Sequence, residues 1–115
     1  RRICAPGYNG LPAGVEDRPD RLERPAKYDL ICHAEINAIV QCARQGISCF
    51  GSTIYSTFFP CNTCTLAIIQ AGIRRVVSWE PASGDEHWEA SIATSRELLD
   101  EAGIIQTVLE RRDDT

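Results

Sequence analysis

Hydrophobic and polar positions along the chain alternate between a spacing typical of helices and one typical of strands. Three segments, residues 34–45, 62–71 and 87–102, carry apolar residues at helical spacing, and a glycine follows each of them as a helix terminator. Short β-rich runs predict strands at residues 52–57, 75–78 and 104–109, and residues 2–5 read as the end of a further strand. Residues 8–27 hold several glycines and prolines and predict a long loop, with shorter polar segments at 81–85 and 111–115.

The order of these elements is strand, helix, strand, helix, strand, helix, strand. Such alternation predicts an α/β domain with helices packed on a mainly parallel sheet. At 115 residues without an internal repeat, the chain is expected to form a single domain, residues 1–115. It opens in mid-strand and contains no methionine, so we expect the natural start to lie upstream, together with a helix and a strand.

Charge and cysteine usage narrow the class of protein. A net charge of −4 argues against a strong general affinity for nucleic acid. The sequence contains no apolar run of membrane-spanning length, so insertion into a membrane is not indicated. Six cysteines could form a disulfide framework, but two are spaced like metal ligands and four sit in apolar surroundings. We therefore expect a reduced protein of the cytoplasm.

The candidate chemistry lies in two short motifs, His33-Ala34-Glu35 and Pro60-Cys61-Asn62-Thr63-Cys64. His33, Cys61 and Cys64 offer one imidazole and two thiolates, and three protein ligands leave a fourth zinc position open, as in catalytic zinc sites. The two cysteines lie three residues apart at a helix start, where both sulfurs point to one side and the thiolate is favoured. The pattern is typical of zinc-dependent nucleobase deaminases.

Glu35 is the candidate catalytic residue. It follows His33 by two positions, within the first turn of a predicted helix, so it could reach the attacking water without binding the metal. A carboxylate there can take a proton from water and pass it to a ring nitrogen and then to leaving ammonia. The pattern therefore predicts hydrolytic deamination of an amino-substituted ring.

Several other interpretations remain open. The Cys-x-x-Cys pair could be a redox site, and a purely structural zinc could take Cys32 as its fourth ligand, although Cys32 adjoins His33. A zinc-containing binding protein without turnover would have no need of Glu35. An enzyme that edits nucleic acid would fit poorly with the acidic charge.

Residues 31–39, 59–64 and 68–73 resemble the deoxycytidylate deaminase branch of the cytidine deaminase superfamily. Residues 7–12 and 27–28 resemble the same branch and distinguish it from tRNA, guanine and free-nucleoside deaminases. The resemblance implies a three-layer α/β/α fold with a mainly parallel central sheet. It also implies residue roles: zinc ligands His33, Cys61 and Cys64, proton shuttle Glu35, Asn9 against the sugar, and the backbone of Ala34 against the pyrimidine. Tyr8 could stack on the base or pack at the rim.

The reaction implied by this resemblance converts dCMP to dUMP and ammonia. Many members are hexamers regulated by dCTP and dTTP, so we expect a homo-oligomer, a hexamer or a dimer, with a possible regulatory site. A modified cytosine nucleotide or a free nucleoside is the alternative substrate. Val15 stands where several members carry a cysteine for a second zinc, so one zinc ion per chain is expected. The acidic segment 79–88 leaves the 5′-phosphate preference open. Arg18, Arg21 and Arg24 could meet a phosphate, although a solvated run of charges is the simpler interpretation.

Overall fold

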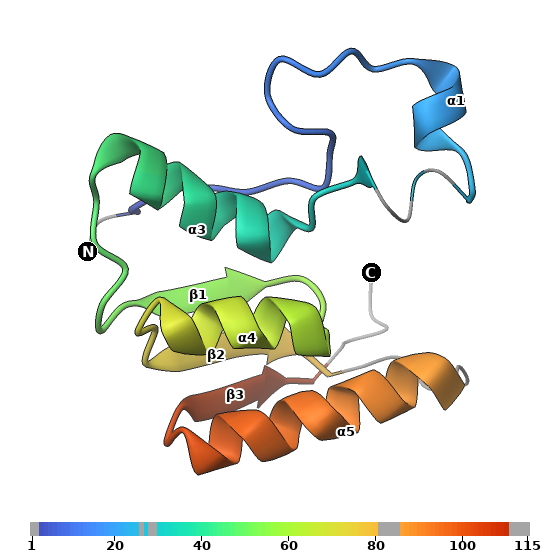
Figure 1. Ribbon diagram of the computed structural model, residues 1–115. Coiled ribbons are helices and arrows are strands. Elements are labelled where there is room, and N and C mark those ends of the chain that lie inside the picture. The colour runs from blue at the N-terminus through green and yellow to red at the C-terminus, as the bar shows by residue number, and fades with distance from the viewer. Residues whose placement is uncertain (1–2, 26, 28–29, 81–85, 111–115) are drawn as a thin grey trace. The chain divides into compact units, whose positions relative to one another are not determined.

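The computed structural model describes residues 3–25, 27, 30–80 and 86–110 (Figure 1). The chain separates into two compact units, Arg1–Ile47 and Ser48–Thr115. The predicted loop 81–85 and the polar tail 111–115 lie outside the described residues.

The second unit is built on a three-stranded parallel sheet. Its strands are β1 (Thr53–Ser56), β2 (Arg75–Trp79) and β3 (Ile105–Leu109), which lie side by side in that order. Helix α4 (Asn62–Gln70) connects β1 to β2, and helix α5 (Glu86–Glu101) connects β2 to β3. All three arrows in Figure 1 point the same way, as parallel strands joined by helical crossovers require. The predicted α/β class and parallel sheet are confirmed.

The hydrophobic core of this unit lies where α4 and α5 meet the sheet. The two helices contact each other, and α5 also contacts β3 (Figure 1). Each element buries residues at its own period, three to four positions apart on the helices and two apart on the strand. These buried residues are Cys64, Thr65 and Ile68 on α4, Ile92, Ser95 and Leu99 on α5, and Val76 and Ser78 on β2.

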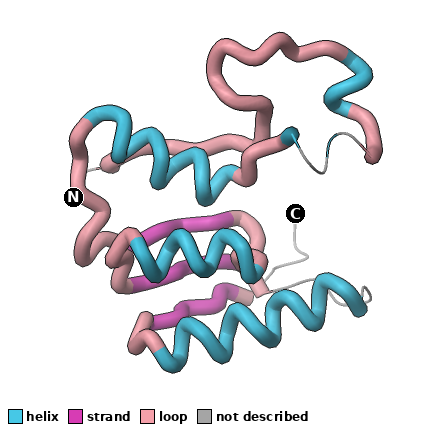
Figure 2. Tube along the Cα trace, viewed as in Figure 1, coloured by secondary structure: helices cyan, strands magenta, loops and turns pink. Residues whose placement is uncertain are grey.

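The first unit is mostly loop, with two described helices, α1 (Pro19–Leu22) and α3 (Ala34–Gln45) (Figure 2). The predicted loop 8–27 is wrong in one respect, because it contains the single turn α1, which begins at a proline suited to a helix start. The predicted strand end at residues 2–5 is also not found. Residue 2 lies outside the described residues, and residues 3–5 form no strand. Strands need a ladder partner, and among the described residues of this unit the only bridge joins Gly10 to Cys32.

Glycines end the three long helices as predicted. Gly46, Gly72 and Gly103 follow α3, α4 and α5 with φ angles of 72°, 79° and 72°. After α3, the N–H of Ile47 donates to the carbonyl of Cys42 at 2.8 Å, and the N–H of Gly46 donates to that of Ala43 at 3.2 Å. The same pair of hydrogen bonds closes α4 and α5. A left-handed residue is needed at this position, and glycine takes that conformation without a steric penalty.

Two further observations concern the whole described chain. None of its helices is long and apolar enough to cross a membrane. The described residues include all six cysteines, and none of them forms a disulfide bond.

Candidate metal centre

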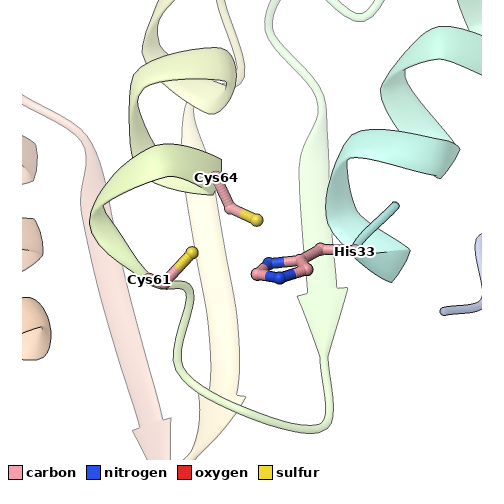
Figure 3. A group of neighbouring side chains, drawn as sticks. All are labelled: His33, Cys61 and Cys64. Atoms are coloured by element: carbon pink, nitrogen blue, oxygen red, sulfur yellow. The ribbon is translucent and has the colours of Figure 1, made fainter. Parts of the chain in front are cut away.

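Three metal-ligating side chains predicted from the sequence come together in the structure. His33, Cys61 and Cys64 each offer one ligand atom, and these atoms lie within 4.8 Å of one another. Figure 3 shows the two sulfurs and the imidazole ring turned toward one another. Both cysteines are buried, whereas His33 is exposed.

The two cysteines are positioned by the start of α4. The chain leaves the carboxyl end of β1, runs through the buried residues Phe59 and Pro60, and enters α4 at its N-cap, Cys61. The carbonyl of Cys61 accepts the first helical hydrogen bond, from the N–H of Thr65 at 2.9 Å. Cys64 then lies one helical turn further on, so its sulfur comes to the same side as that of Cys61 (Figure 3). Sites commonly form at this end of the strands in α/β sheets.

His33 is the N-cap of α3, and its carbonyl accepts a hydrogen bond from the N–H of Asn37 at 2.9 Å. The side chain of His33 makes no capping hydrogen bond to its helix. The first N–H of the helix, at Ala34, donates instead to Oδ1 of Asn9 at 2.7 Å. A side chain 25 positions away therefore satisfies one of the N–H groups at the helix start that have no partner within the helix.

Residues 7–10 are held against the start of α3. Gly10 and Cys32 exchange two backbone hydrogen bonds of 3.1 and 2.8 Å, and the amide nitrogen of Asn37 donates to the carbonyl of Tyr8 at 2.6 Å. At Gly7, a Cβ atom would collide with the carbonyl oxygen of Ala34 and would lie 2.7 Å from the N–H nitrogen of Ala38. Only glycine fits this close approach of loop to helix.

The donor set fits a zinc ion. Two thiolates and one imidazole are ligands that zinc prefers, and bonds of ~2.3 Å to sulfur in a tetrahedron place two sulfurs about 3.8 Å apart. The observed limit of 4.8 Å is within about an ångström of that arrangement. Among the described residues, no aspartate or glutamate belongs to the cluster. The cluster is therefore suited to one zinc ion with three protein ligands.

The remaining predicted site residues lie in the first unit, Ala34 and Glu35 at the start of α3 and the others in the segment that precedes this helix. Glu35 is the second residue of α3 and is half-buried. Tyr8 is 78% exposed, and its carbonyl, rather than its ring, makes the contact to Asn37. The loop arginines find local partners: Arg18 pairs with Asp20 at 3.2 Å, and Arg21 donates to the carbonyl of Glu16 at 3.0 Å. These local contacts match the simpler interpretation of a solvated charge run.

Sequence reasoning missed two residues that support the site. Asn37 joins the loop to α3, and Ser91 of α5 hydrogen-bonds to Asn62, which lies between the two cysteines in the sequence. Asn37 is a polar position within an apolar helical run, which is a weak signal. Ser91 carries no signal in the sequence, because its contact spans 29 positions.

Comparison with known proteins gives consistent matches. Residues 1–80 match the family model described as the cytidine and deoxycytidylate deaminase zinc-binding region. A deoxycytidylate deaminase from Pongo abelii is 36% identical over 110 residues, which cover 90% of this chain and 58% of that protein. An uncharacterized deaminase from the luxG 3′ region of Aliivibrio fischeri is 38% identical over 109 residues, covering 94% of this chain and 72% of that protein.

A solved structure is also similar. The dCMP deaminase of cyanophage S-TIM5, in complex with dCMP and dUMP, matches with a TM-score of 0.67 and 27% identity. The match covers 90% of this chain and 70% of the phage chain. By contrast, the chain spans less than two thirds of the length of the Pongo abelii relative.

Proposed function

The chain belongs to the cytidine and deoxycytidylate deaminase family and has its α/β fold, and on this premise we propose that it converts dCMP and water to dUMP and ammonia. The proposal is supported by the relatives that carry the name deoxycytidylate deaminase and by the phage enzyme that binds dCMP and dUMP. We also propose that the whole chain, residues 1–115, acts as one deaminase domain. The structural match to the dCMP deaminase of cyanophage S-TIM5 in its apo form covers 91% of this chain, which supports a single domain.

The observation that carries the proposal is the cluster of His33, Cys61 and Cys64. We assign these residues as the zinc ligands. A zinc ion with three protein ligands keeps an open position, where it lowers the pKa of a water from 15.7 to about 7 and so supplies a nucleophile at neutral pH. Among the described residues, two buried cysteines and a histidine form the cluster without a fourth protein ligand, which favours this use over a structural zinc.

Glu35 is the residue proposed to move protons. Its carboxylate accepts a proton from the attacking water, delivers it to N3 of the cytosine, and supplies a proton to the departing amino group. The first proton stays on N3. A second proton, from the hydroxyl added to C4, passes through Glu35 to the amino group; the C4–O bond forms, the C4–N bond breaks, and ammonia leaves with that second proton. Support comes from its position two residues after His33 and from its place outside the ligand cluster.

Asn9, Ala34 and Tyr8 are proposed to contact the substrate. Since Oδ1 of Asn9 is engaged by the N–H of Ala34, the amide nitrogen of Asn9 is the group that would donate to a sugar hydroxyl. A pyrimidine oxygen at Ala34 would share this N–H or take it over from Asn9. The exposed ring of Tyr8 would stack on the base.

The proposal also covers the assembly, regulation and location of the protein. We propose a homo-oligomer, a dimer or a hexamer, regulated by dCTP and dTTP and acting in the cytoplasm. The resemblance of residues 7–12 to the deoxycytidylate deaminase branch, many of whose members are regulated by dCTP and dTTP, supports the regulation. The placement of the cysteines supports a reducing compartment. Light scattering measures the molar mass of the assembly. Measured with and without dCTP, it tests the oligomeric state and whether the nucleotide changes it.

The test of function is ammonia release by the zinc-loaded protein with dCMP, CMP, deoxycytidine and 5-methyl-dCMP in parallel. We expect turnover of the deoxynucleotide monophosphates and little or none of the other two. Turnover of deoxycytidine alone would show that the substrate is a nucleoside rather than a nucleotide. Ammonia from none of the four would overturn the proposal.

A further inference from the structure

The first turn of α4 lacks the cap that helices usually receive from their own N-cap residue. An N-cap side chain normally accepts a hydrogen bond from an N–H of the first turn, and serine, threonine, aspartate and asparagine do this best. The N-cap of α4 is Cys61, whose side chain makes no such capping hydrogen bond. Its sulfur is turned toward Cys64 and His33 instead (Figure 3). The residue that would cap the helix is thus used as a metal ligand.

Ser91 of α5 caps the start of α4 from outside the helix, at its first N–H. The N–H of Asn62, the first residue of α4, donates to Oγ of Ser91 at 3.0 Å. The hydroxyl of Ser91 in turn donates to Oδ1 of Asn62 at 3.1 Å. One hydroxyl is therefore donor and acceptor to the same residue, which fixes the position of Asn62 relative to α5.

A second contact from α5 lies on the other side of Cys61. The guanidinium of Arg96 stands over the ring of Phe59, 5.1 Å from its centre, and this ring is 1% exposed. A cation at this distance from an aromatic face is attracted by the ring. Phe59 precedes Cys61 by two positions, and Asn62 follows it directly. Helix α5 thus holds the chain on both sides of the first cysteine.

We propose that α5 acts as a clamp that presets the two cysteines for zinc, with Ser91 as its principal positioning residue. The proposal rests on the zinc site of the proposed function but concerns metal affinity rather than turnover. A preset turn loses less conformational freedom when the metal binds, so affinity is higher. Residues that orient metal ligands without touching the metal commonly change metal affinity by 10–100-fold.

The test compares two alanine variants of the same helix. Ser91→Ala removes the cap, while alanine is a good helix former and leaves α5 itself intact. Ser95→Ala is the matched control, because Ser95 lies one turn further along α5 and its buried hydroxyl has no hydrogen-bond partner among the described residues. Zinc affinity is measured by competition with a chromophoric chelator, and circular dichroism reports folding of the metal-free protein.

We expect Ser91→Ala to bind zinc about tenfold more weakly. We expect Ser95→Ala to bind like the wild type, and Ser91→Thr, which keeps the hydroxyl, to restore affinity. An unchanged affinity in Ser91→Ala, or an equal loss in both alanine variants, would overturn the proposal. If Ser91→Ala does not fold, Arg96→Met, a change at an exposed side chain, is tested instead. Weaker zinc binding by Arg96→Met would support the clamp, and unchanged affinity would refute it. Because no substrate is present, the result is independent of whether dCMP is turned over.

Discussion

Two residues at helix starts, His33 and Cys61, are proposed as metal ligands in places where most helices carry a capping side chain. Each helix makes up for this through a distant residue: Asn9 binds the first N–H of α3, and Ser91 binds the first N–H of α4. Neither side chain makes a capping hydrogen bond to its own helix. The local rule for helix starts is therefore broken at the metal centre and compensated by tertiary contacts.

Asn9 offers a way to separate capping from substrate binding. Asn9→Asp keeps an acceptor oxygen for the N–H of Ala34 but loses the amide donor, so we expect wild-type stability with KM for dCMP raised about tenfold. Asn9→Ala loses both groups and should also lower the free energy of unfolding by about 1 kcal/mol. Urea denaturation and steady-state kinetics measure the two effects. An unchanged KM in Asn9→Asp would remove Asn9 from the substrate site.

Cys61 tests the ligand set. We expect Cys61→Ser to lose nearly all bound zinc, because zinc would keep two strong ligands, while serine at an N-cap should leave α4 as stable as before or more so. Metal analysis after gel filtration measures zinc per chain. Cys4→Ser, at an exposed cysteine outside the cluster, is the control and should retain the metal. Full zinc content in Cys61→Ser would refute the assignment.

At the scale of the elements, the helix ends depend on left-handed glycines with different surroundings. A Cβ atom at Gly72 would lie 2.7 Å from Cδ1 of Phe50, whereas a Cβ at Gly103 would meet nothing within 4 Å. We expect Gly103→Ala to cost about 1 kcal/mol from backbone strain alone. Gly72→Ala should cost more, since the Phe50 side chain must also move. Urea denaturation of both variants gives the comparison, and equal losses would contradict it.

These elements also show what the sequence could and could not predict. Helices α3, α4 and α5 were predictable to within a residue or so, because their periodicity and terminal glycines are local signals. Cys61 and Cys64 were predictable as a pair because they belong to one turn, and His33 was predictable because it stands in a short motif with Glu35. The turn α1 lies in a stretch too short and polar to show a period. The roles of Asn37 and Ser91 depend on contacts across 29 positions, which no local pattern encodes.

At the scale of the whole molecule, zinc and folding are expected to be coupled. A metal that binds the folded chain far better than the unfolded one stabilises it by about 4 kcal/mol at a thousandfold excess over its dissociation constant. We therefore expect a strong chelator to lower the unfolding temperature by several degrees, and added zinc to restore it. Differential scanning calorimetry measures the shift. An unchanged unfolding temperature after verified zinc removal would contradict this coupling.

The central claim is that this family member deaminates dCMP with Glu35 as the proton-transferring group. The most direct measurement is dUMP formation from dCMP by the zinc-loaded wild type and by Glu35→Gln, which keeps the shape of the side chain. The account predicts dUMP from the wild type, a rate lower by about 10²–10⁴-fold in Glu35→Gln, and equal zinc content in both proteins. Equal rates in the two proteins, or no dUMP from the zinc-loaded wild type, would contradict it.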